Sequence, residues 1–60
     1  MTAADLRALR DRLGITQAEL AGRLFISRDA VAKLEAGKNR MSKPVEELAR
    51  QLSEFNNGRE

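Results

Sequence analysis

Two helix patterns follow each other with only about three residues between them, within residues 16–37 of the chain. The first begins at "TQAE", where Thr16 is a suitable N-cap and Glu19 follows three positions later, as in a capping box. The second begins at Ser27, also a good N-cap, and ends at Gly37. So short a connection suits two helices that meet at roughly 90–120° rather than a long antiparallel hairpin. The spacing therefore predicts a helix-turn-helix unit.

Further helices are predicted on both sides of this unit. A stretch from residue 2 begins with a capping box of Thr2 and Asp5 and stops at Gly14. Another stretch begins near Pro44, a residue that suits the first turn of a helix. No segment alternates with a period of two, so no sheet is expected. The prediction is a compact all-α domain over residues 1–55, followed by a frayed tail at residues 56–60.

The apolar residues of the four stretches recur at spacings of three and four, which predicts a single shared core. Ile26, in the short connection, is assigned to this core, where its burial would contribute about 1.5–3 kcal/mol. The other residues assigned to the core are Leu6, Leu9, Leu13, Leu20, Leu24, Val31, Leu34, Leu48 and Leu52. Three further residues are placed on the apolar faces of their helices: Ala21, Val45 and Phe55.

Composition excludes several classes of function. The 60 residues include no cysteine and no histidine, which rules out disulfides, zinc sites built on these ligands and histidine-based acid–base catalysis. The serines lack a histidine base and no glycine-rich phosphate loop is present, so neither an enzyme nor a cofactor is expected. The first residues break their apolar positions with charges, unlike a signal peptide, and no later run could span a bilayer. A soluble cytoplasmic protein is therefore expected.

Charge is unevenly distributed along the chain, although the net charge is only +2. Residues 28–43 carry five basic and two acidic side chains, whereas residues 44–60 carry two basic and four acidic ones. The basic block is either an electrostatic footprint for phosphates or a solvated surface. Charge alone does not separate these two interpretations.

The run "ITQAELAGRLFISRDAVAKLEAGK" resembles the helix-turn-helix of the lambda-repressor-like family, also described as Cro/CI or XRE-type. The resemblance continues more weakly through "LRALRDRLG" and "ELARQL". It implies sequence-specific binding of double-stranded DNA, most often for transcriptional repression, and usually by a symmetric homodimer. Members usually have five helices and this chain ends where the fifth would begin, so a bundle of four helices, or five, is expected. The matching positions are Gln17, Leu20, Ala21, Ile26, Ser27, Val31, Leu34, Glu35 and Gly37.

The second helix of the unit carries the candidate base-reading residues. In the resembling repressors the positions of Arg28, Asp29 and Lys33 contact base edges. Arg28 suits the O6 and N7 of guanine, Asp29 the N4 amine of cytosine, and Ala32 a thymine methyl group. Asp29 has a second interpretation, because it lies in the first helical turn and four residues before Lys33. It would then only stabilise the helix.

Candidate phosphate contacts surround these residues. Gln17 stands at the N-terminus of its helix, where resembling proteins bind a phosphate with this amide and neighbouring backbone N–H groups. The resemblance also implies a partly buried salt bridge between Glu35 and Arg10, with a structural role. For Lys43 a solvated lysine is an equal alternative. The other candidate phosphate contacts are Ser27, Lys38, Asn39 and Arg40.

A dimer is expected from the short length of DNA that one domain can contact, as well as from the resemblance. One such domain reads only about 4 to 6 base pairs, whereas two with recognition helices about 34 Å apart would read a palindromic operator. Met41 and Phe55 are candidates for the two-fold contact, or else peripheral core residues. The alternative function is an antitoxin-like or other protein-interaction module with secondary DNA binding. The basic loop after Gly37 favours DNA, since protein-binding faces are richer in aromatic residues and methionine.

Phe25 is the residue that fits the resemblance least. Related proteins usually have glycine here because the turn needs a left-handed backbone, which costs other residues roughly 1–2 kcal/mol. Either Phe25 accepts this strain and packs its ring beside the first or fourth helix, or the turn follows a different path.

Overall fold

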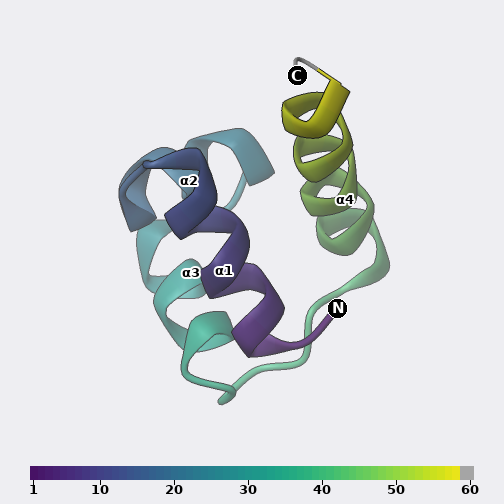
Figure 1. The fold of residues 1–60 in the computed structure, drawn as a ribbon. Coiled ribbons are helices and arrows are strands. Elements are labelled where there is room, and N and C mark those ends of the chain that lie inside the picture. Colours follow the sequence, from purple (N-terminus) through teal and green to yellow (C-terminus); the bar gives the residue numbers. More distant parts are fainter. Residues whose placement is uncertain (59–60) are drawn as a thin grey trace.

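The computed structural model describes the backbone of residues 1–58 and the side chains of residues 1–54. Within this part the chain forms four helices and no strand: α1 (Ala3–Leu13), α2 (Gln17–Leu24), α3 (Arg28–Glu35) and α4 (Lys43–Gly58). In Figure 1, α1, α2 and α3 gather on one side and α4 stands on the other. The expected all-α bundle with a helix-turn-helix of the second and third helices is confirmed. The expected division of the chain at residue 55 stays a prediction.

The first three helices begin at the caps that the sequence predicts. Thr2 Oγ1 accepts from the backbone N–H of Asp5 at 3.1 Å, and Asp5 Oδ2 accepts from the N–H of Thr2 at 3.0 Å. Thr16 and Glu19 form the same reciprocal pair at 3.1 and 2.8 Å. Ser27 Oγ accepts from the third N–H of α3 at 3.1 Å. These bonds satisfy backbone donors that the first turns leave unpaired, so each helix start is fixed locally.

The same three helices also end in the same way, with one left-handed residue after the last turn. The left-handed residues are Gly14 (φ 69°), Phe25 (φ 60°) and Gly37 (φ 77°). In each case the following N–H donates back across the last turn, to the carbonyl five residues earlier, as in a Schellman motif. For α2 this bond runs from the N–H of Ile26 to the carbonyl of Ala21 at 3.0 Å.

Phe25 therefore adopts the left-handed backbone, but the expected packing of its ring is wrong. The Phe25 residue is 83% exposed and does not pack beside α1 or α4. In a Schellman motif the residue after the left-handed one makes the hydrophobic contact with the helix. Here that residue is Ile26, which is half-buried and packs against the core. The motif thus turns Ile26 inward and leaves the phenyl ring in solvent.

The core lies where all four helices meet. The six residues Leu6, Leu9, Leu20, Leu24, Val31 and Leu34 are buried, as the sequence predicts. The remaining core assignments are only partly buried and pack around its edge: Leu13, Ile26, Leu48 and Leu52. Ala49 of α4 is fully buried and was not predicted, because alanine adds little to an apolar pattern. Its position shows that the centre of α4 approaches the core with a small side chain.

α4 is joined to the rest of the bundle by polar contacts as well as by the core. α1 packs against α3 and α4, and α2 packs against α3 and α4. Arg12 of α1 donates to Ser53 Oγ of α4 at 3.0 Å. The ammonium group of Met1 contacts Glu46 in the first turn of α4, and Glu46 also accepts from Arg50 at 3.1 Å. No helix of the described residues is long and apolar enough to cross a bilayer.

Candidate nucleic-acid interface

One side of α3 packs on the core, and the opposite side is polar and faces solvent. Val31 and Leu34 are buried, which anchors the helix on the core. The exposed positions on the opposite side are Ser27, Arg28, Asp29, Lys33 and Ala36, and Ala32 is half-buried. All four candidate base-reading residues thus lie on α3, with Arg28, Asp29 and Lys33 exposed and Ala32 half-buried.

Asp29 and Lys33 pair with each other on this face. Asp29 Oδ2 lies 3.1 Å from Lys33 Nζ, and the two side chains are 76% and 51% exposed. An exposed pair four residues apart in a helix stabilises it by only about 0.3–0.5 kcal/mol. The contact that the helix-stabilising interpretation of Asp29 requires is thus present. The ion pair is weak, so either side chain can leave it and bind another group.

Behind this face, one carboxylate joins three helices. Glu35 of α3 has a side chain that is 5% exposed, and it accepts from Arg10 Nε at 2.7 Å and Arg10 Nη2 at 3.2 Å. Gln17 Nε2 of α2 donates to the same carboxylate at 3.1 Å. Arg10 also donates to the carbonyl of Ile15 at 3.2 Å. The Arg10–Glu35 pair that the resemblance implies is therefore found.

Glu35 is ionised at neutral pH in spite of its burial. Burial by itself would raise the pKa of this carboxyl group, because it penalises the charged form. The hydrogen bonds from Arg10 and Gln17 outweigh that effect and hold the pKa of Glu35 below its ordinary value. The three side chains thus form a fixed charged network under the polar face of α3.

The contact between Gln17 and Glu35 was not predicted, and it bears on the phosphate candidate. Residues 17 and 35 lie on different helices, and only the packing of α2 on α3 brings them together. A glutamine amide nitrogen carries two hydrogens, so one remains for a further acceptor. Glu35 therefore fixes where the Gln17 amide stands at the N-terminus of α2.

The remaining candidate phosphate contacts lie around the end of α3. Lys38, Asn39 and Arg40 are exposed in the loop after α3, and Lys43 is exposed as the first residue of α4. Met41 is half-buried and packs against the core, as its peripheral-core interpretation expects. The other candidate for a dimer contact, Phe55, lies outside the side chains that the structure describes.

A comparison with protein families shows to which family the chain belongs. A family model described as "Helix-turn-helix domain" matches residues 3–52, which includes the first three helices and most of α4. The chain belongs to this helix-turn-helix family. The match is consistent with an XRE/Cro-like domain, and it indicates DNA binding and a role in transcription regulation. No curated protein and no solved structure shows a significant match to the chain.

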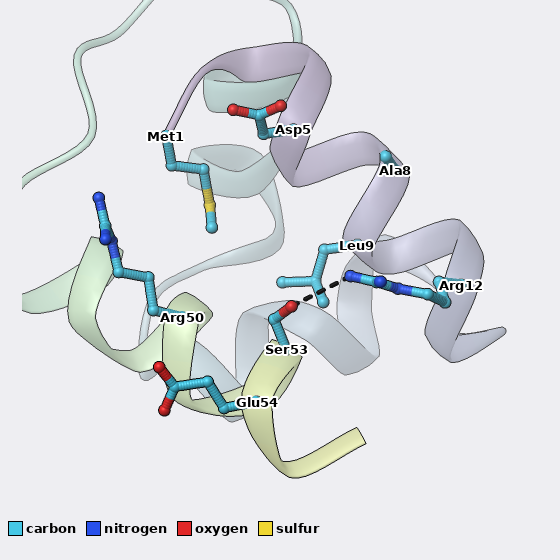
Figure 2. A pocket seen from close by; sticks show the side chains of 8 residues that line it. All are labelled: Met1, Asp5, Ala8, Leu9, Arg12, Arg50, Ser53 and Glu54. Carbon is cyan, nitrogen blue, oxygen red and sulfur yellow. Dashed lines mark hydrogen bonds between the residues drawn. The ribbon is translucent and has the colours of Figure 1, made fainter. Parts of the chain in front are cut away.

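In this helix-turn-helix domain a hollow of about 450 Å³ lies away from the unit formed by α2 and α3. It opens between α1 and α4 and is bridged by the hydrogen bond from Arg12 to Ser53, as Figure 2 shows. Its walls combine apolar residues with acidic and basic side chains, and no residue of α2 or α3 lines it. Helix-turn-helix domains are typically not enzymes. Among the described residues no group of three or more acidic side chains is placed to hold a metal ion.

Proposed function

We propose that the chain is a sequence-specific transcriptional repressor that binds double-stranded DNA as a homodimer. The observation that carries this proposal is the outward polar face of α3, anchored from behind by Val31 and Leu34. A recognition helix enters the major groove with its N-terminal turns first. Those turns carry Arg28 and Asp29, the two residues best suited to base edges. Such a regulator would work in the cytoplasm, where it meets its operator.

Base reading is assigned to Arg28, Asp29, Ala32 and Lys33. Arg28 would donate bidentately to a guanine, and Ala32 would contact a thymine methyl group. Asp29 would accept from a cytosine amine, and Lys33 would follow into the groove as the ion pair between them opens. The pair is exposed, so opening it costs only a few tenths of a kcal/mol. A half-site that contains G·C pairs is the expected consequence.

Phosphate binding is assigned to residues that surround α3. Gln17 would use its second amide hydrogen, and the positive end of the α2 dipole would attract the same anion. These contacts would fix the register of the protein on DNA without reading sequence. The remaining residues in this group are Ser27, Lys38, Asn39, Arg40 and Lys43, all of them exposed.

The homodimer follows from the length of DNA that one domain can cover. Residues 1–55 would form one reading unit, and two units with recognition helices about 34 Å apart would match a palindromic operator. The two-fold contact is assigned to Phe55 and the solvent-facing part of Met41. Since Met41 already packs on the core, its contribution to the contact would be small.

A second candidate function is a protein-interaction module with secondary DNA binding, as in antitoxin-like domains. The observation that favours it is the exposed Phe25 ring, since exposed aromatic residues are enriched where proteins bind one another. The two candidates predict different effects of removing this ring. The Phe25→Ala variant would keep operator affinity if the chain is a repressor that binds DNA by α3, whereas it would bind a protein partner more weakly if the chain is an interaction module.

The proposed function is tested by titrating the purified chain with the DNA upstream of its own gene at several salt concentrations. We expect affinity to fall steeply with salt and one site to be preferred over scrambled DNA. Arg28→Ala should relax the base preference at one position of each half-site, whereas Arg40→Ala should weaken binding to all sequences alike. Absence of binding at about 50 mM salt would refute the repressor proposal.

A further inference from the structure

A hollow of about 240 Å³ lies beside Gln17 and is formed by three helices. α1 contributes two basic residues to it. Two alanines one turn apart, one in α3 and one at its C-cap, leave the space open with their small side chains. Its complete lining is Arg7, Arg10, Gln17, Ala32, Glu35 and Ala36. Gln17 and Ala32 also belong to the proposed DNA contacts, so the hollow borders the recognition face.

The charges around the hollow leave one uncompensated cation. Arg10 binds Glu35 with two hydrogen bonds, so these two opposite charges largely cancel. Arg7 is exposed and forms no ion pair with another described residue. It nevertheless lies close enough for its charge to help lower the pKa of Glu35. The hollow as a whole therefore favours an anion.

We propose that this hollow receives a backbone phosphate of the operator and that Arg7 binds it, next to the phosphate contacted by Gln17. A helix in the major groove has a sugar–phosphate strand on each side, and the elements that flank the helix contact these strands. Arg7 stands on α1 beside the Ala32–Ala36 edge of α3, where such a strand would pass. A guanidinium group binds phosphate through two parallel N–H donors. α1 thereby becomes part of the interface as well as a support for it.

This inference rests on the proposed function, and a charge-matched pair of variants separates the two. Arg7→Gln removes the cation at the hollow. Arg23→Gln removes an exposed cation in the last turn of α2 that does not line this hollow. Both arginines are exposed, so both variants should keep the thermal unfolding temperature of the unmodified chain. The Arg7→Lys variant keeps the charge at the hollow.

The readout is the slope of log K against log salt concentration for the operator. Arg7→Gln should reduce the slope by about 0.9, which corresponds to one phosphate contact and to an about eightfold lower affinity at 0.1 M salt. Preference for the operator over scrambled DNA should not change, because phosphate contacts carry no sequence information. Arg23→Gln should leave the slope unchanged, and Arg7→Lys should retain it.

Equal slopes for Arg7→Gln and Arg23→Gln, whether both reduced or both unchanged, would overturn the assignment of Arg7. That result would leave the proposed function standing, provided that the unmodified chain binds its operator. If the unmodified chain does not bind DNA at all, the proposed function fails before any variant is compared.

Discussion

The left-handed backbone at Phe25 allows a direct test of strain by substitution. Two variants are compared, Phe25→Ala and Phe25→Gly. The first removes the ring and keeps the Cβ in the left-handed conformation (φ 60°, ψ 38°), and the second removes the Cβ as well. The difference between the two variants therefore measures the backbone conformation and not the ring.

The expected magnitudes follow from the exposure of Phe25. Full burial of a phenylalanine is worth about 1.5–3 kcal/mol, and roughly a sixth of Phe25 is buried, so Phe25→Ala should lose about 0.3–0.5 kcal/mol. Glycine relieves about 1–2 kcal/mol of left-handed strain but costs about 0.5–1 kcal/mol of additional chain entropy. We therefore expect Phe25→Gly to be more stable than Phe25→Ala by about 0.5–1 kcal/mol.

Urea denaturation measures this difference, and thermal unfolding should show it as about 2–8 °C in a domain of this size. Gly14→Ala is the matched control, because Gly14 occupies the same place in its own Schellman motif and a Cβ there meets no atom within 4 Å. It should lose a similar net amount, because the new Cβ adds the same left-handed strain, offset by the same entropy term. A Phe25→Gly variant no more stable than Phe25→Ala would refute the strain argument.

Three further predictions concern the charged groups. Arg10→Met should destabilise the fold by about 3 kcal/mol in urea denaturation, because it leaves the Glu35 carboxylate buried without its main partner. The double variant Arg10→Met/Glu35→Leu should recover most of that loss, and no recovery would show that the pair itself stabilises the fold. The pKa of Glu35 is lower in the folded chain than its ordinary value of 4.5, so the unfolded state binds more protons. The contribution of Glu35 to the free energy of unfolding is therefore complete above pH 4.5, and it is lost as the pH falls through the lower folded pKa. Glu35→Gln should make the denaturation midpoint depend less on pH across this acid range. Asp29→Asn should change stability by only a few tenths of a kcal/mol, and a change in base preference in operator titrations would separate base reading from helix stabilisation.

The helix boundaries and most of the core could be predicted from the sequence because they depend on short-range chemistry. The starts of three helices are predicted by the N-cap hydroxyl groups of Thr2, Thr16 and Ser27. The spacing of apolar residues predicts which leucines are buried. These signals depend on residues close together in the sequence, so they can be recognised without knowledge of the fold. The outward face of α3 follows from the same spacing.

The features that could not be predicted from the sequence depend on how the helices pack against one another. The contact of Gln17 with Glu35 spans 18 residues of chain, and no local pattern indicates that both side chains share one site. Burial of Ala49 likewise depends on how closely α4 approaches the centre. The exposure of Phe25 is a different case, because recognition of the Schellman pattern would have shown that the next residue, Ile26, is the one that turns inward.

The caps at both ends of α1, α2 and α3 also bear on how fast the chain folds. Each of these helices has its length set by bonds between residues at most five positions apart, and α2 and α3 pack on each other as neighbours in sequence. Little loop-closure entropy must then be lost before favourable contacts form, which is the condition for folding in about microseconds to milliseconds. The α2–α3 unit, which carries the proposed recognition face, is thus the part of the chain whose native contacts can form earliest.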